Sequence, residues 1–335
     1  MILEKKLQLA WQRIKEARNI LLVGHVSPDP DALSSIGAML EICQLFNLKA
    51  QAYAQGKSNG TYGFIPHEKE VRDIKPVNLH NFDVILILDC GSLARTGLIL
   101  ELNSLLQSKK QNQLSRPFII EFDHHEPHDR YADLEIKLPQ KAATVEIIYD
   151  FLKVNNLPIN KIIADCILIG LMSDTGHFLH SNSSFKALAI SSQMLLKGAS
   201  LNKLSTQIKG VGGMVALKIW GKALENLKFN PDTGLASSAL TEEELSDFLN
   251  EKEALLASDV FGEIASFISY LPGVKVALFL REEDGRIKGS LRSNGSDINV
   301  AKIAGLFGGG GHKRAAGFAV LGKLAATKNG WKVIS

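Results

Sequence analysis

The sequence predicts an α/β protein: a parallel-sheet domain covered by helices on both faces, then a helical linker and a smaller α+β domain. Up to about residue 190, short runs that are apolar throughout alternate with helical patterns, which is typical of parallel strands buried on both faces. After about residue 226, closely spaced strand candidates are separated by turns, which favours an antiparallel sheet. We place the domains at 1–199 and 227–335, with the linker at 200–226.

The elements of the first domain follow in order. Residues 1–20 form an amphipathic pattern that predicts a helix. The strand candidates, each a short apolar run, are Asn19–Val26, Lys49–Gln55, Phe82–Cys90 and Arg116–His125. The further helical patterns, which carry apolar residues at the spacing of a helix, are Asp31–Leu48, Ala142–Val154 and Asn160–Met172.

The second half of the chain starts with a polar, helical stretch that contains glycines at Gly210 and Gly212–Gly213, and this stretch is the predicted linker. Beyond it we expect a hairpin, an acidic helix, two strands and a glycine-rich turn. These elements are Leu227–Leu240, Thr241–Leu249, Val274–Glu282, Arg286–Asn294 and Gly308–Gly311.

Composition excludes several classes of protein. A net charge of +3, from 38 basic and 35 acidic residues, is too small for a protein that coats duplex nucleic acid. No apolar run reaches the roughly 18 residues that span a bilayer, and the charged N-terminus is unlike a signal peptide, so no membrane association and a cytoplasmic location are expected. The cysteines, Cys43, Cys90 and Cys166, are far apart among apolar residues, as buried reduced thiols are.

Acidic residues and histidines follow three of the predicted strands. His25, Asp29 and Asp31 follow the first strand, Asp89 lies at the end of another, and the tripeptide 123–125 ends a third. Because parallel strands present their carboxyl ends at one edge of the sheet, these side chains should converge there. Asp174, after an apolar helix, adds another carboxylate.

So many carboxylates in one place require a cation, since like charges raise one another's pKa. A mixed set of carboxylates and imidazoles suits two manganese or related ions better than calcium or structural zinc. Each residue alone has a simpler explanation: Asp31 before a helical pattern can be its N-cap, and His25 a buried polar residue. Their convergence favours the metal site. The histidines His67, His80 and His128 are expected at the surface.

The motifs resemble those of the DHH phosphoesterase family, named for the tripeptide found here as Asp123-His124-His125. The other segments that match in order are HVSPDPDA (25–32), LDCGSLARTG (88–97), FDHHEPHD (122–129) and LMSDTGHFLHSNSS (171–184). The segment Gly308–Phe318, GGGGHKRAAGF, is similar to the DHHA1 domain that accompanies this family. The resemblance implies an active site in the cleft between the two domains.

The resemblance also implies the role of each residue. His25, Asp29 and Asp89 would hold one metal, and Asp31, Asp89, His124 and Asp174 the second, with Asp89 bridging. His125 would act on the scissile phosphate as a donor or proton carrier, and Asp123 would orient the histidines. Two divalent ions, Mn2+ first and Mg2+ or Co2+ as alternatives, would activate a water for phosphoester hydrolysis.

The DHHA1-like segment would grip the nucleotide. The residues with this expected role are Arg292, Ser293, Gly309, Gly310, Gly311, His312 and Lys313. Arginine suits bidentate phosphate contacts and stacking on a base. A bare glycine run is more often a flexible turn, so its role depends on these neighbours. Arg95 either binds substrate phosphate or forms a structural ion pair.

The first functional hypothesis is a manganese-dependent phosphoesterase that degrades short oligoribonucleotides (nanoRNA) to mononucleotides and converts 3′-phosphoadenosine 5′-phosphate (pAp) to AMP. Substrates would be short RNA or DNA oligonucleotides and small nucleotides, and a homodimer is left open. The alternatives are a stand-alone phosphodiesterase for cyclic di-AMP or linear pApA, a RecJ-like single-strand exonuclease, and a non-catalytic nucleotide-binding module.

Overall fold

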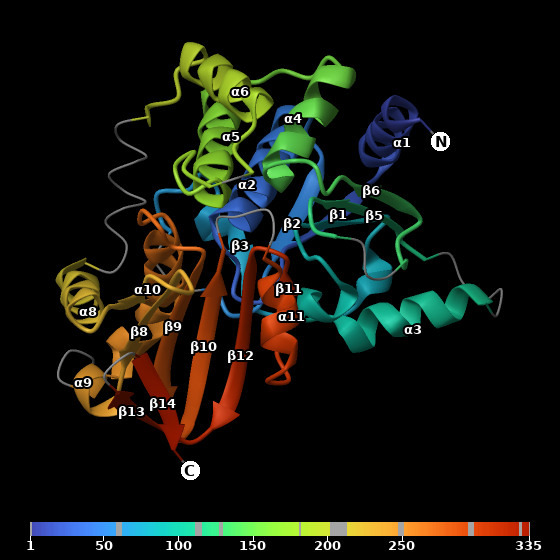
Figure 1. The fold of residues 1–335 in the computed structure, drawn as a ribbon. Coiled ribbons are helices and arrows are strands. Elements are labelled where there is room, and N and C mark those ends of the chain that lie inside the picture. Colours follow the sequence, from blue (N-terminus) through green and yellow to red (C-terminus); the bar gives the residue numbers. More distant parts are fainter. Residues whose placement is uncertain are drawn as a thin grey trace. The chain divides into compact units, whose positions relative to one another are not determined.

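The computed structural model describes residues 2–57, 62–110, 116–126, 130–180, 182–201, 213–246, 251–293, 298–327 and 330–334. The chain divides into two compact units, Met1–Lys209 and Gly210–Ser335 (Figure 1). Among the described residues, no helix is both long enough and apolar enough to cross a membrane.

The first unit is built on a six-stranded sheet in the order β3-β2-β1-β4-β5-β6, in which every neighbouring pair is parallel. Its strands are β1 (Asn19–Val23), β2 (Lys49–Tyr53), β3 (Val71–Arg72), β4 (Val84–Leu88), β5 (Phe118–Asp123) and β6 (Leu134–Lys137). The predicted parallel sheet is confirmed, although the sequence analysis missed the short edge strands β3 and β6. The strand order reverses between β1 and β4, and such a switch point is where open α/β sheets bind ligands.

Helices cover both faces of this sheet. They are α1 (Leu3–Glu16), α2 (Pro30–Leu45), α3 (Ile99–Lys110), α4 (Thr144–Val154), α5 (Lys161–Asp174) and α6 (Phe185–Leu196), with short 3-10 turns η1 (Glu68–Glu70), η2 (Leu79–Asn81) and η3 (Leu93–Thr96). On one face Leu102 of α3 packs into a cluster with Ile85 of β4. On the other face Phe151 of α4 packs edge-on against Phe122 of β5, with ring centroids 5.5 Å apart.

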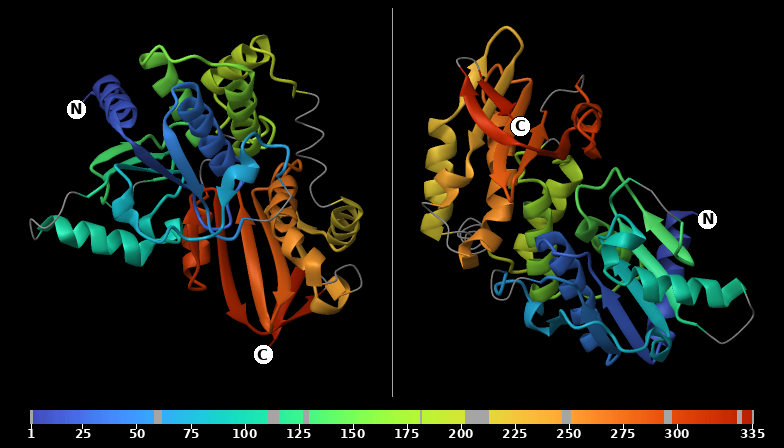
Figure 2. Two further views of the ribbon diagram at one scale, coloured as in Figure 1. Left: turned by 180° about the vertical axis from the view of Figure 1, so that it is seen from behind. Right: turned by 90° about the horizontal axis from the view of Figure 1, so that it is seen from below.

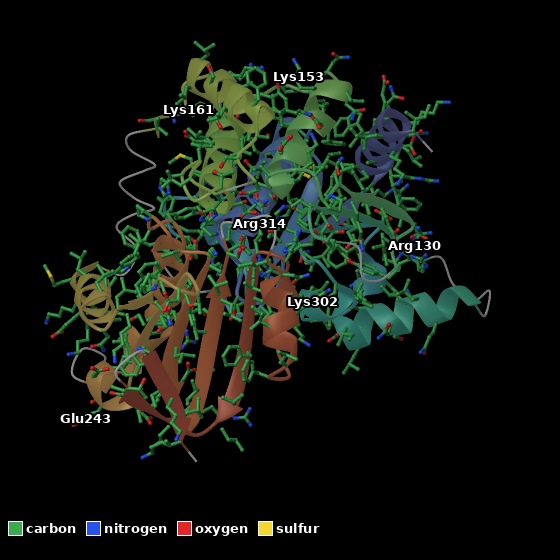
Figure 3. The ribbon with its side chains drawn as sticks, viewed as in Figure 1. Arg130, Lys153, Lys161, Glu243, Lys302 and Arg314 are labelled. Atoms are coloured by element: carbon green, nitrogen blue, oxygen red, sulfur yellow. The ribbon has the colours of Figure 1, made fainter. Side chains whose placement is uncertain are left out.

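The helices α2, α4 and α5 pack against one another beside the sheet. Both α2 and α5 are buried around most of their circumference, which explains why apolar residues occur on all sides of these helices. Figure 3 shows Lys153, near the end of α4, and Lys161, at the start of α5, at the same end of the helix layer. The start of α4 and the end of α5 therefore lie at the opposite end.

The second unit has a mixed six-stranded sheet in the order β11-β12-β10-β9-β8-β7, in which β8 and β9 are parallel and the other pairs antiparallel. Its strands are β7 (Lys228–Asn230), β8 (Leu235–Leu240), β9 (Val276–Glu283), β10 (Arg286–Arg292), β11 (Gly310–His312) and β12 (Ala315–Leu321), with a separate hairpin β13 (Lys323–Thr327) and β14 (Gly330–Ile334). The predicted hairpin over 227–240 is confirmed as β7 and β8. The predicted smaller α+β architecture is confirmed as well, but the expected antiparallel sheet is mixed, because β8 and β9 pair in parallel across the helical connection that joins them.

The helices of the second unit are α8 (Gly213–Glu225), α9 (Glu242–Ser246), α10 (Glu251–Ser269) and α11 (Val300–Gly305). Figure 2 shows α8 and α10 on one side of the sheet and α11 on the other. Ile219 of α8 packs with Ile264 of α10 in the core of this unit, so the end of the predicted linker is part of the core. Residues 202–212, with Gly210 and Gly212 of the linker, lie outside the described residues, and the predicted domain boundaries stay a prediction.

Candidate metal centre

The loop after β1 presents two acidic residues and a histidine at the carboxyl end of the sheet. Asp29 caps α2, because its Oδ1 accepts a hydrogen bond from Ala32 N at 3.0 Å, and Pro30 suits the first helical position. The interpretation of Asp31 as the N-cap is therefore wrong: it lies in the first turn and is fully buried. His25 is also buried; its Nε2 makes no hydrogen bond within the described structure and lies 3.4 Å from Asp29 Oδ2.

Asp89 follows β4, the neighbour of β1, and is 1% exposed. Its backbone is in the left-handed region, with φ of 62°. This conformation costs a residue with a side chain about 1–2 kcal/mol, and such strain persists where surrounding structure enforces it. Here Asp89 N donates to Phe122 O of β5 at 3.0 Å, which fixes the turn that directs the carboxylate.

The residues after β5 are held by Asp123. Its Oδ2 accepts from Gly91 N at 2.5 Å, and its Oδ1 accepts from His125 N at 2.9 Å and lies 2.7 Å from His125 Nδ1. Burial raises the pKa of Asp123, but its hydrogen bonds with His125 and Gly91 lower that pKa by more, so the net shift is downward. The Asp123 carboxylate is therefore ionised and accepts the proton on Nδ1 of His125. Asp123 thus ties the loop after β4 to the loop after β5.

His124 faces two other carboxylates. Its Nε2 lies 3.1 Å from Oδ2 of Asp174, the last residue of α5, and 3.5 Å from Oδ1 of Asp89. The pKa of His124 is lowered by burial but raised more strongly by Asp174 and Asp31, to about 9.

The start of α4 lies among the same residues, which the sequence analysis did not foresee. Asp31 accepts hydrogen bonds from Thr144 N at 2.6 Å and from Val145 N at 3.2 Å. The Thr144 hydroxyl donates to Asp89 Oδ1 at 2.8 Å. Nothing in the segment AATVE distinguishes this threonine from an ordinary residue in the first turn of a helix.

The side chains form three overlapping groups whose ligand atoms lie within 4.8 Å of one another. The groups are His25 with Asp29 and Asp89, Asp31 with His124 and Asp174, and Asp89 with His124 and His125. The buried carboxylates of Asp31 and Asp89 form no salt bridge with a Lys or Arg among the described residues, and Nε2 of His25 makes no hydrogen bond there. Such a set fits divalent metal ions.

The carboxylates of this cluster repel one another, as the directions of their pKa shifts indicate. The pKa of Asp31 is raised, mainly by burial and next by the negative charge of Asp174. The pKa of Asp89 is also raised, mainly by burial and next by the negative charge of Asp31. Burial also raises the pKa of Asp174. At Asp29 burial acts in the same direction, but His25 outweighs it and lowers the pKa to about 2. Divalent ions would relieve this repulsion.

Arg95 lies beside this cluster, with Nη1 3.5 Å from His125 Nε2 and its side chain exposed. No carboxylate within the described ranges pairs with Arg95 at salt-bridge distance. Its guanidinium is therefore available to an anion near His125.

In the second unit, the predicted grip residues lie on β10, β11 and their connections. Arg292 Nε donates to Ser266 Oγ of α10 at 3.2 Å, burial lowers its pKa, and no described carboxylate forms an ion pair with it. Ser293 is buried and its N donates to Arg314 O at 3.0 Å. A half-buried guanidinium that pairs with no described carboxylate is suited to an anionic ligand.

The glycine-rich segment begins in the predicted turn, at Gly308, and continues as the edge strand β11 from Gly310 to His312, which the prediction of a turn alone missed. A side chain on Gly309 would come within 2.2 Å of Gly317 O, and one on Gly311 within 2.5 Å of Ala315 O. Both glycines are thus needed for close approach to β12, whereas Gly310 is open. Lys313 is exposed, and the His312 side chain lies outside the described structure.

Comparison with known proteins yields two family matches. Residues 19–171 match the DHH family, N-terminal domain, and residues 245–326 match the DHHA1 domain. The first match contains the strands and helices that carry the metal centre as far as α5, and the second contains Arg292 and β11.

Relatives align over most of the chain. The bifunctional oligoribonuclease and PAP phosphatase NrnA of Thermus thermophilus is 26% identical over 319 residues, 95% of this chain and 89% of that protein. The protein of the same name from Bacillus subtilis is 25% identical over 304 residues, 90% of this chain and 89% of that protein. A crystal structure of an exopolyphosphatase-related protein from Bacteroides fragilis has the same fold, with a TM-score of 0.81 at 24% identity over 94% of this chain and 91% of that one.

Proposed function

We propose that the chain degrades short oligoribonucleotides to mononucleotides and dephosphorylates pAp to AMP. It carries a DHH family N-terminal domain and a DHHA1 domain, and is thereby a metal-dependent hydrolase of phosphoester bonds. Relatives named for both activities, aligned over about nine-tenths of the chain, support this substrate choice.

The observation that carries the proposal is the set of three overlapping acidic and imidazole groups at the switch point of the parallel sheet. We assign His25, Asp29 and Asp89 to one ion, and Asp31, Asp89, His124 and Asp174 to the other. When bound, two divalent ions lower the pKa of a water and neutralise charge on the departing oxygen. Manganese suits the mixed ligand set, and Mg2+ and Co2+ are the alternatives.

The protein's own groups bind and orient the phosphate. His125, held by Asp123 through Nδ1, presents Nε2 outward, 3.5 Å from Arg95 Nη1. When both of its ring nitrogens carry a proton, His125 keeps the bond to Asp123 through Nδ1, and its Nε2 donates to a phosphate oxygen or passes its proton to the departing oxygen. Arg95 adds a positive charge beside the same oxygen atoms, where charge develops during hydrolysis.

The second unit supplies nucleotide binding in this proposal. The half-buried Arg292, with Ser293 and β11, offers a cation and backbone donors to the base or to the phosphate that is not cleaved. That one substrate contacts both units stays a prediction, as do the homodimer and the cytoplasmic location.

A panel assay tests the proposed function. Metal-stripped protein, resupplied with Mn2+, is offered pAp, dinucleotides, five-residue RNA and cyclic di-AMP, and products are separated by chromatography. We expect AMP from pAp and mononucleotides from the short RNAs, and no turnover in EDTA. Asp89→Asn should abolish turnover, while Asp83→Asn, at the amino end of β4, should retain it.

Turnover of cyclic di-AMP alone would overturn the substrate assignment in favour of a cyclic dinucleotide phosphodiesterase. Preference for long single strands would favour a RecJ-like exonuclease. Hydrolysis that survives both EDTA and Asp89→Asn would contradict the metal centre itself.

A further inference from the structure

The first turn of α4 contacts two of the proposed metal ligands at once. Two successive backbone amides, of Thr144 and Val145, donate to Asp31, and the Thr144 hydroxyl donates to Asp89. Asp31 and Asp89 come from different elements, so one helical turn fixes the distance between carboxylates that the sheet alone leaves adjustable.

We propose that Thr144 is a positioning residue whose hydroxyl sets the orientation of the Asp89 carboxylate for metal binding. The inference rests on the proposed function, because it takes Asp89 as the ligand common to both ions. It concerns a contact that lies behind the ligands, and Thr144 itself binds neither metal nor substrate in this proposal.

Geometry shows why Asp89 needs such a contact. Its Oδ1 lies 3.5 Å from His124 Nε2 and 3.6 Å from His125 Nδ1, so rotation of the carboxylate would move this oxygen relative to both imidazoles. The hydroxyl bond at 2.8 Å selects one rotation of the carboxylate. The second oxygen then keeps a defined direction, as a carboxylate shared by two ions requires.

Thr144 is itself held rigidly. It is fully buried, and its branched side chain has few allowed rotamers in a helix. Two hydrogen bonds of Glu146 hold this turn against the preceding residues. Glu146 Oε2 accepts from Ala142 N at 3.0 Å, and Glu146 Oε1 accepts from Lys141 Nζ at 2.9 Å. A residue that must only fill space would not need this combination of a fixed backbone and an aimed hydroxyl.

The test compares Thr144→Val, which keeps the shape and removes the hydroxyl, with Thr144→Ser, which keeps the hydroxyl. Mn2+ affinity is measured by isothermal titration calorimetry on metal-stripped protein without substrate. We expect Thr144→Val to weaken Mn2+ binding about 10- to 100-fold, and Thr144→Ser to restore it to within a few-fold of wild type. Thr144→Ala gives the same test if the valine variant does not fold.

Thr96→Val is the matched control. Thr96 is also fully buried in the first unit; its hydroxyl donates to Leu93 O at 2.7 Å and accepts from Leu98 N at 3.1 Å, and neither partner is a candidate metal ligand. The Thr96→Val variant should unfold at a lower temperature than the wild type in EDTA, while its affinity for Mn2+ should be unchanged.

The outcomes separate the two proposals. Wild-type affinity in Thr144→Val, with reduced stability alone, would show a merely structural threonine and overturn this inference while leaving the proposed function intact. Equal weakening in the serine and valine variants would also overturn it, since the hydroxyl would then be irrelevant. Wild-type protein that binds no Mn2+ would overturn the metal centre and this inference with it.

Discussion

Asp123→Asn should loosen the link between the loops after β4 and β5 while preserving side-chain volume. The carboxylate now accepts from three N–H groups, at 2.5 Å from Gly91 N, 2.9 Å from His125 N and 2.7 Å from His125 Nδ1. The amide has one accepting oxygen, so its NH2 must face at least one of these donors. The change therefore leaves a buried donor unsatisfied and weakens the remaining bonds.

The magnitude follows from those losses. A buried donor without an acceptor costs about 1–3 kcal/mol, and replacing charge-assisted bonds by neutral ones removes about 1 kcal/mol more. The sum of about 2–4 kcal/mol corresponds to at least about a 30-fold rise in local opening. Amide hydrogen exchange at Gly91 and His125, followed by NMR in EDTA, measures this quantity directly.

Asp83→Asn is the control for this measurement. Asp83 Oδ2 accepts from Arg18 N at 2.7 Å and Asn19 N at 2.8 Å, at the amino end of β4. The rate of amide hydrogen exchange at Gly91 in Asp83→Asn should equal that of the wild type. If Asp123→Asn leaves exchange at Gly91 and His125 at the wild-type rate, Asp123 does not tie the loops together and the reasoning fails.

Three further predictions concern other parts of the chain. Gly170→Ala would bring a methyl group to 2.5 Å from Asp31 Oδ1, so it should cost about 1–3 kcal/mol of stability and weaken Mn2+ binding; Gly221→Ala, with open space around it, should do neither by calorimetry. Glu121 is fully buried, and burial raises the pKa of its carboxyl from 4.5 to about 7. The folded state therefore binds this proton more tightly than the unfolded state does, and the free energy of unfolding falls as pH rises from 4.5 to 7. Denaturant unfolding of metal-free protein should show the stability of wild type falling relative to Glu121→Gln by up to about 3 kcal/mol between pH 4.5 and 7, and a pH-independent difference would refute the assignment. Arg292→Lys should raise KM for pAp about tenfold through loss of the planar donor pair, with Mn2+ affinity unchanged; an unchanged KM would remove Arg292 from the binding site.

The sequence predicted the parallel sheet because burial on both faces leaves a direct trace: every residue of β4 is apolar and buried. It predicted the second architecture from closely spaced strands separated by turns, and β10 shows the alternating burial of a strand with one face partly exposed. It also predicted which acidic residues follow the strands, since the edge of a parallel sheet is fixed by chain direction. The short strands β3 and β6 left no such trace because two and four residues are too few to show a pattern.

Contacts between distant segments were beyond sequence reasoning. Asp29 caps α2, whereas Asp31 accepts a hydrogen bond from Thr144 N at the start of α4. The role of the Thr144 hydroxyl is visible only from its hydrogen bond to Asp89. His67, expected at the surface, has a side chain 9% exposed, with Nε2 2.7 Å from Glu41 and Nδ1 2.6 Å from Glu70. In each case the partner is chosen by tertiary packing.

The bond between Thr144 N and Asp31 joins residues 113 positions apart, and the candidate ligands run from His25 to Asp174. Such contacts form only after long stretches of chain have closed, at an entropic cost that local structure cannot offset early in folding. A fragment lacking either the loop after β1 or the end of α5 would therefore lack part of the ligand set, however well its helices formed. Uptake of Mn2+ by a truncated or nicked chain would thus report whether the first unit has assembled from end to end.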